Sequence, residues 1–243
     1  MSKKFLLILF IGIIIRVYII GNTGFLADIS FWKSWSLAAS DHGVVWASLN
    51  TNTNYPPAFL YVLWLMGKMY ALIGNPHNFA DYWRQNNFAF LLVSKSIAII
   101  SDVIIASLIY WFFSRFPHVI PSHATRDEES HTDVHKQVTR SLDFARDDKL
   151  GLLLSSVFFL NPIIFLDSAI WGQVESFGIL FTLTAIITLF YRRPVLATAI
   201  FTIGTMMKLQ NIIFIPIFFL FIWRYFDLPT MIKSVAAAAF TFL

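Results

Sequence analysis

Residues 161–176 read NPIIFLDSAIWGQVES, and this stretch interrupts a series of apolar runs with polar groups that a lipid core does not accommodate cheaply. Asp167 and Glu175 are carboxylates, Trp171 is an aromatic residue of the kind that lies at membrane interfaces, and Gly172 permits a turn. An apolar run ends within this stretch and another begins directly after it. The stretch therefore predicts that the chain leaves the membrane and returns, and that the turn carries two carboxylates.

The composition of the 243-residue chain is that of a membrane protein. Hydrophobic residues make up 57% and charged residues 13%, whereas soluble domains average about 25% charged. Several apolar runs approach the roughly 20 residues that a spanning helix needs, so we expect one all-α, polytopic membrane domain over residues 1–243. The basic residues gather at the ends of these runs, where topology and lipid headgroups account for them, so no nucleic-acid partner is indicated. The absence of cysteine excludes disulfides and Cys-based metal sites.

The distribution of lysine and arginine predicts which loops face the cytoplasm, because short loops rich in these residues stay inside. Most of the 18 basic residues fall inside if the N-terminus is cytoplasmic and the apolar run over residues 57–73 lies on the outer surface. This arrangement predicts about seven transmembrane helices. It also predicts an external loop over residues 21–87 with two amphipathic surface helices, one over residues 28–39 and one beginning at Tyr55.

Two segments differ in kind from the apolar runs. Residues 116–149 are rich in charge, which predicts a solvated, disordered cytoplasmic loop. His131 and His135 have the spacing of metal ligands on a helix, but no third ligand is evident, so the solvated loop is favoured over a metal site. The chain stops within the apolar run 234–243, which predicts further spans beyond residue 243.

Ionisable residues inside or beside the apolar runs are the candidates for function, because burying them in lipid requires partners or water. Asp28 heads the first surface helix, where a carboxylate serves either as a general base or as a helix N-cap; taken alone it favours the cap. Lys95 and Asp102 share a face of one span, about 10 Å apart, too far for a direct salt bridge. Arg16 lies near the outer end of the first span. For these last three residues, structural and functional roles both stay open.

Six further residues fall on the same, non-cytoplasmic side as Asp28. A lysine that closes a span there runs against the inside bias and indicates an anionic partner such as phosphate. Two carboxylates around a turn are able to orient a sugar, bind a divalent cation or pair with that lysine. A glutamine and a tryptophan beside them suit a sugar through hydrogen bonds and stacking. The six residues are Lys208, Gln210, Asp167, Glu175, Gln173 and Trp171.

These motifs follow a fixed order along the chain. The order is Asp28, Tyr55-Pro56-Pro57, the span from Lys95 to Asp102, Asn161-Pro162, Asp167, Trp171-Gly172-Gln173 and Lys208-Leu209-Gln210. It resembles the GT-C integral-membrane glycosyltransferases, in particular bacterial relatives of the polyprenyl-phosphate-sugar-dependent mannosyl- and glucosyltransferases of the GPI-anchor and asparagine-linked glycan pathways. The resemblance covers most of the chain outside the charged loop.

The resemblance implies a GT-C-like enzyme of the bacterial inner membrane that transfers a hexose, with inversion, from a polyprenyl-phosphate donor to a glycan, lipid or protein acceptor at the outer membrane face. By the same mapping, Asp28 is the catalytic base. No metal ligand is assigned, and a divalent cation is the one cofactor left open. The mapping gives acceptor or sugar contacts to Tyr55, Asp167, Trp171, Gln173 and Glu175, and donor-phosphate contacts to Lys208, Gln210 and Arg16.

Two other classes of function stay open at this point. In a secondary transporter, Arg16, Lys95 and Asp102 would form a substrate path inside the membrane. Inverted repeats would favour that class, and the sequence contains none that we detect. In a non-catalytic membrane scaffold, the clustering of polar residues on one side would have no catalytic meaning.

Overall fold

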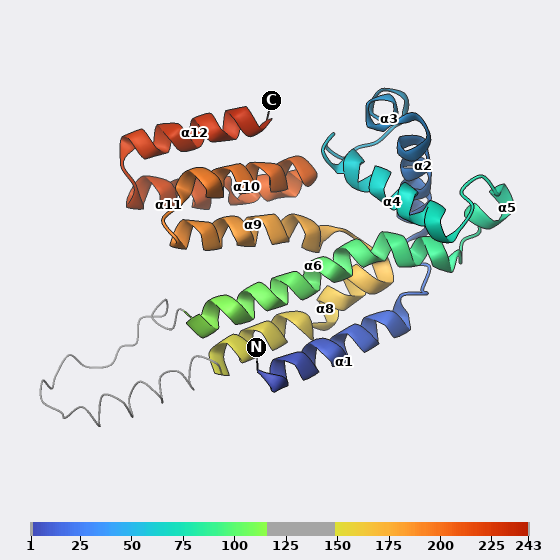
Figure 1. The fold of residues 1–243 in the computed structure, drawn as a ribbon, viewed down its shortest axis with the longest axis horizontal. Coiled ribbons are helices and arrows are strands. Elements are labelled where there is room, and N and C mark those ends of the chain that lie inside the picture. Colours follow the sequence, from blue (N-terminus) through green and yellow to red (C-terminus); the bar gives the residue numbers. More distant parts are fainter. Residues whose placement is uncertain (1, 116–148, 243) are drawn as a thin grey trace, which may run out of the picture.

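The computed structural model describes residues 2–115 and 149–242, and this part of the chain is helical throughout apart from short connections (Figure 1). The predicted charged loop, with His131 and His135, lies outside the described residues except for Lys149. The helices are α1 (Lys3–Ile19), α2 (Leu26–His42), α3 (Val44–Asn50), α4 (Phe59–Ile73), α5 (Phe79–Tyr82), α6 (Phe88–Arg115), a helix over Lys149–Phe159, α8 (Pro162–Phe165), the π-helix η2 (Leu166–Trp171), α9 (Glu175–Phe190), α10 (Pro194–Met207), the 3-10 helix η3 (Leu209–Phe214), α11 (Ile215–Tyr225) and α12 (Leu228–Phe242).

The helices form two groups (Figure 1). Helices α1, α6 and α8–α12 lie with their axes roughly parallel or antiparallel and make up a bundle, in which α9 packs on α6 and α10, and α10 packs on α12. Helices α2–α5 gather beyond the end of the bundle at which α6 begins. We call this second group the end unit. Because α2 and α4 cover the ranges predicted for the two surface helices, the end unit matches the predicted external loop in its helices; its position at the membrane surface stays a prediction.

Helix length supports fewer membrane spans than the sequence suggested. Helix α6, at 28 residues, is long and apolar enough to cross a bilayer. The helix Lys149–Phe159 and the segment Pro162–Trp171 meet the same criteria only as one pair bent by 46°. Other apolar helices in the described ranges, including α9, α10 and α12, have between 10 and 17 residues. The all-α fold is thus confirmed, whereas the count of about seven spans is not established.

The end unit is held together by an aromatic and aliphatic core shared with the first turns of α6. Trp32 of α2, Phe59 and Leu63 of α4 and Phe90 of α6 are almost completely buried in it. Helices α2 and α4 approach so closely that a Cβ atom on Gly67 would lie 2.5 Å from a backbone oxygen of α2. Glycine is therefore the residue that this crossing requires, and the crossing fixes the first turn of α2 relative to α6.

A buried polar cluster joins four parts of the bundle. Asp102 of α6 pairs with Arg16 of α1, with 3.0 Å between Oδ2 and Nη2, and both side chains are 0% exposed. Ser168 of η2 donates a 2.7 Å hydrogen bond to the same carboxylate, and Ser176 of α9 donates one to its other oxygen. Arg16 also donates to two backbone oxygens. We call these four residues the Asp102 cluster. Because Arg16 and Asp102 already find their hydrogen-bond and charge partners within the bundle, a structural role is favoured for both.

Lys95 has a separate set of partners, as the spacing of the two residues on α6 predicted. Its Nζ atom donates to the backbone oxygens of Ile20, Asn22 and Ala169, at 3.0, 2.5 and 2.9 Å. The side chain is fully buried, and these oxygens belong to the end of the first span and to η2. Lys95 therefore fastens η2 to α6 and to the chain that follows α1, which again favours a structural role over a transport path.

Candidate functional site

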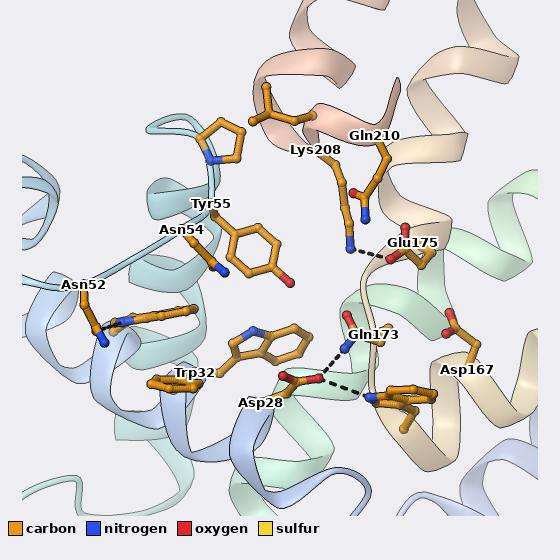
Figure 2. Close-up of a pocket in the computed structure, with 15 residues that line it drawn as sticks. Asp28, Trp32, Asn52, Asn54, Tyr55, Asp167, Gln173, Glu175, Lys208 and Gln210 are labelled. Carbon is orange, nitrogen blue, oxygen red and sulfur yellow. Dashed lines mark hydrogen bonds and ion pairs between the residues drawn. The ribbon is translucent and has the colours of Figure 1, made fainter. Parts of the chain in front are cut away.

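A cavity of about 720 Å³ opens between the end unit and the bundle (Figure 2). One wall comes from the first half of α2 and the chain before α4, and the other comes from η2, the start of α9 and the start of η3. Every site residue predicted from the sequence lines it except Arg16, which belongs to the Asp102 cluster. The lining residues are Asp28, Phe31, Trp32, Trp35, Asn52, Asn54, Tyr55, Pro56, Asp167, Trp171, Gln173, Glu175, Lys208, Leu209 and Gln210.

The stretch that opened the sequence analysis forms the bundle wall of the cavity. Asn161 caps α8 by accepting a 2.9 Å hydrogen bond from the backbone N of Ile163, and Pro162 occupies the first turn. The helix then widens into the π-helical turn 166–171, a form that often occurs at functional sites. Gly172 ends this turn with φ of 86°, in the left-handed region that favours glycine. The chain turns away from the bundle at this glycine, and the side chains of Gln173 and Glu175 that follow it line the cavity.

Asp28 links the two walls. It lies in the first turn of α2, whose N-cap is Phe25, so the structure does not support the capping role. Its Oδ2 atom accepts a 3.1 Å hydrogen bond from Trp171 Nε1 and a second from Gln173 Nε2 (Figure 2). Both donors are neutral. Asp28 therefore holds the turn that follows η2 against α2, and within residues 2–115 and 149–242 its carboxylate makes no ion pair with a basic side chain.

Lys208 and Glu175 form an ion pair at the bundle side of the cavity. The distance between Lys208 Nζ and Glu175 Oε1 is 2.7 Å, and Lys208 is 6% exposed (Figure 2). The same Nζ atom lies 5.5 Å from the centre of the Tyr55 ring, within the range of a cation–π contact. Of the alternatives that the sequence left open for the two carboxylates, pairing with the lysine is observed for Glu175.

Asn211 was missed by the sequence analysis and holds this ion pair in place. It is 4% exposed, and its Nδ2 atom donates a 3.0 Å hydrogen bond to the backbone oxygen of Gly178. That bond fixes η3 to the first turn of α9, so it sets the position of Lys208 relative to Glu175. A polar residue directly after Lys208-Leu209-Gln210 is the only signal that the sequence offers.

Tyr55 belongs to an aromatic wall that the end unit contributes. Its ring stacks on Phe59 with 4.4 Å between centroids and meets the edge of Trp35. Burial, with a smaller effect from nearby carboxylates, raises the pKa of the Tyr55 phenol to about 12, so the hydroxyl stays protonated and is able to donate. Asn52, which the sequence analysis also missed, accepts a 3.0 Å hydrogen bond from Trp35 Nε1. The run NTNTNY over residues 50–55 carried that signal.

The acidic residues of the cavity do not converge as metal ligands do. Within the part of the chain that the structure describes, no group of three or more histidine or acidic side chains is placed to hold a metal ion. The divalent cation that the sequence left open therefore has no donor set among these residues.

A family model matches most of the chain. It is that of the GPI transamidase subunit PIG-U, and it covers residues 49–243. This chain belongs to the PIG-U family. None of the curated proteins and none of the solved structures compared with the chain matches it. Membership supports a location in a membrane, whereas the bacterial inner membrane and the cytoplasmic N-terminus stay predictions.

Membership in the PIG-U family corrects the predicted activity. The family consists of subunits of a transamidase, not of glycosyltransferases, so the assignment of this chain as a GT-C hexosyltransferase is wrong. A polyprenyl-phosphate sugar donor and a base role for Asp28 both depended on that assignment. The glycosyltransferase assignment was based on the order of motifs along the chain. Carboxylates, amides and aromatic rings serve sugar recognition as well as sugar transfer, so that order does not distinguish the two.

Proposed function

We propose that this chain is a non-catalytic substrate-binding subunit of a membrane complex, and that its cavity holds the glycan of a GPI-type glycolipid while a partner subunit carries out the reaction. The observation that carries the proposal is the cavity between the end unit and the bundle, whose two walls both combine aromatic rings with amide and carboxylate groups. Family membership supplies the class of lipid.

The size and lining of the cavity support a glycan ligand. Small-molecule sites in proteins enclose about 300–1,000 Å³, and this cavity has about 720 Å³. Sugar rings present flat apolar faces and equatorial hydroxyls, which suit aromatic side chains and hydrogen-bonding groups respectively. Trp32 and Trp171 supply the first kind of surface, and Asn54 and Gln210 supply the second. The cavity therefore matches both chemical features of a glycan.

The position of Asp28 supports binding over catalysis. Its carboxylate already accepts hydrogen bonds from Trp171 and Gln173, and these bonds shape the wall that a sugar would contact. A group engaged in this way stabilises a fixed surface. The role fits a subunit that positions a substrate for a reaction centre elsewhere.

The proposal is tested by measuring lipid binding to the full-length purified chain in detergent micelles. A phosphatidylinositol that carries a short mannose-containing glycan should bind at least tenfold more tightly than phosphatidylinositol itself. Replacing Trp171 by alanine removes a stacking surface and a partner of Asp28, so we expect about tenfold weaker binding of the glycolipid. Equal binding of the two lipids to the unmodified chain would contradict the proposal.

Trp64→Ala is the matched control for this experiment. Trp64 lies on α4, is 38% exposed and does not line the cavity. The substitution removes the same indole from a surface that the proposal does not use. We expect binding within twofold of the unmodified chain.

A further inference from the structure

A second cavity lies in the bundle, between α10, η3, α11 and α12. Its volume is about 630 Å³, and its lining consists of apolar residues, three threonines and one serine. It follows α12 from Met231 to Phe242, a length of about 16 Å at the rise of a helix. It shares no lining residue with the cavity beside the end unit. We call this second cavity the groove.

Ser234 is the unusual residue of the groove. It lies on α12, is 2% exposed, and its Oγ atom makes no hydrogen bond with any residue in the ranges 2–115 and 149–242. The other hydroxyls of the groove belong to Thr198, Thr202 and Thr205, and each donates to the backbone oxygen four residues before it. Burying a hydroxyl among apolar groups is unfavourable unless it finds a hydrogen-bond partner. The groove is therefore suited to an occupant that supplies an acceptor at Ser234.

Arginines gather at the end of the groove where α12 begins. This end lies away from the end unit (Figure 1). Arg192 and Arg193 lie in the turn between α9 and α10, and Arg224 is in the last turn of α11. The two turns are neighbours, because the Arg192 guanidinium lies 5.9 Å from the centre of the Phe226 ring. All three arginines are exposed, and none forms an ion pair with another residue that the structure describes.

The acidic residues of the two turns do not balance these arginines. Asp227 is the one carboxylate on the turns, and its charge is attracted to Lys233 on α12. Three arginines and one lysine against one aspartate leave a formal charge of +3. Ser234 lies six residues after the start of α12, which is about 9 Å along the helix. The charged end and the unpartnered hydroxyl therefore lie within one lipid headgroup region of each other, and clusters of basic residues attract anionic headgroups.

The shape of the groove favours a hydrocarbon chain over a partner helix. The volume spread over the length gives a mean cross-section of about 40 Å², whereas a helix with side chains is 10–12 Å wide and occupies roughly 80–110 Å². A free anion would bind at the arginines but would leave the apolar walls empty. A phospholipid carries an acyl chain, an ester oxygen and a phosphate in that order. The groove offers apolar walls, the Ser234 hydroxyl and the arginines in the same order.

We infer that the groove binds an anionic phospholipid from the leaflet nearest the two turns. Its acyl chain lies between α10, α11 and α12, an ester oxygen accepts a hydrogen bond from Ser234, and its phosphate lies beside Arg192 and Arg224. This lipid is separate from the glycolipid of the proposed function, because it binds at the other end of the bundle. The inference goes beyond the proposed function and does not rest on it.

The experiment titrates two lipids with the same acyl chains, phosphatidylglycerol and phosphatidylcholine, against the full-length purified chain in detergent micelles. Thermal unfolding is recorded with and without each lipid. Phosphatidylglycerol should bind about tenfold more tightly, because its net negative charge meets the arginines. Glycerol phosphate, which has the charge but no acyl chain, should not raise the unfolding temperature. Equal binding of the two lipids, or an equal effect of glycerol phosphate, would overturn the inference.

A double variant tests the headgroup contact. Arg192→Gln combined with Arg193→Gln removes two charges from the turn, so the preference for phosphatidylglycerol should fall to within twofold while binding of phosphatidylcholine stays unchanged. The matched control is Lys68→Gln combined with Arg84→Gln, because both residues are exposed and belong to the segments of the end unit. This control should keep the preference. A preference that survives in the first variant would show that the turn does not bind the headgroup.

Two substitutions on α12 test the groove itself. Ala238→Phe fills the groove and should weaken binding of both lipids at least tenfold, whereas Ala236→Phe adds the same ring at an exposed position outside it and should change binding less than twofold. Ser234→Ala removes the unpartnered hydroxyl, so it should raise the unfolding temperature of the lipid-free chain and weaken lipid binding about threefold.

The Ser234→Ala result keeps the inference testable if Ala238→Phe does not fold. A lower unfolding temperature of lipid-free Ser234→Ala, with lipid binding unchanged, would show that the hydroxyl serves the protein alone and would overturn the inference. Equal effects of Ala238→Phe and Ala236→Phe would also overturn it. So would a dimer in micelles that Ala238→Phe dissociates, because a second copy of the chain would then be the occupant of the groove.

Discussion

The Asp102 cluster and the cavity both contain charged side chains, but the partners of those side chains differ. In the cluster, Asp102 has an arginine and two serines as partners, and the arginine and carboxylate are 0% exposed. In the cavity, Asp167 is attracted to Lys208 but makes no side-chain hydrogen bond or ion pair among the described residues, and it faces an open space. The difference teaches that an ionisable residue in a membrane protein indicates a binding site only where the protein itself does not supply all of its hydrogen-bond and charge partners. Ionisable residues whose partners all come from the protein, such as Asp102, hold helices together.

The largest effect should come from breaking the saturated cluster. Asp102→Ala leaves Arg16 buried without its counter-charge, and removal of one partner from a buried ion pair costs about 3–5 kcal/mol. The measurement is thermal or denaturant unfolding of the purified chain in detergent. As a control, Asp81→Ala removes a carboxylate from an ion pair that is mostly exposed, for which we expect less than about 1 kcal/mol. Similar losses in both variants would show that the cluster is not structural.

A smaller effect on stability, coupled to binding, is expected at Asn211. Asn211→Ala leaves the buried oxygen of Gly178 without its donor, which costs about 1–3 kcal/mol. Because that bond positions η3, the Lys208–Glu175 pair should loosen and glycolipid binding should weaken by about threefold. Unfolding and lipid titration on the same sample measure the two effects. Asn50→Ala is the control, since Asn50 makes an exposed hydrogen bond of the same kind to Trp46; stability should change by less than about 0.5 kcal/mol.

Sequence order predicted which residues share the cavity, because the predicted topology put them on the same side of the membrane. Asp28 and Gln173 are 145 residues apart in sequence and nonetheless touch. Arg16 was assigned to the same site, but it pairs with Asp102 and does not line the cavity. Asp102 lies 86 residues away in sequence, and no neighbouring residue indicates that pairing. Asn211 was missed for the same reason, since Gly178 lies 33 residues before it. Pairings between distant helices are the part that one sequence does not specify.

The predicted activity failed at a different level. An aspartate that acts as a general base and an aspartate that only accepts hydrogen bonds, as Asp28 does from Trp171 and Gln173, look identical in a sequence. The role of Asp28 therefore could not be read from residue type and order alone. The number of spans is not established by helix length, because α10 has only 14 residues, fewer than the roughly 20 that cross a bilayer, and η3 interrupts the run that follows.

The smallest effect on stability, and the sharpest test of the contrast, is expected at Asp28. Asparagine keeps one oxygen to accept from Trp171 and Gln173, so Asp28→Asn should lower the free energy of unfolding by less than about 1 kcal/mol. It removes a charge from the wall that contacts the glycan, so binding of the mannose-containing glycolipid should weaken by about threefold. The same two measurements on Asp102→Asn should give the opposite pattern, with lower stability and an unchanged preference for the glycolipid over phosphatidylinositol. If Asp28→Asn instead destabilises the protein as strongly as the substitution in the cluster, then the charge of Asp28 serves the junction between the end unit and the bundle, as the charge of Asp102 serves the bundle.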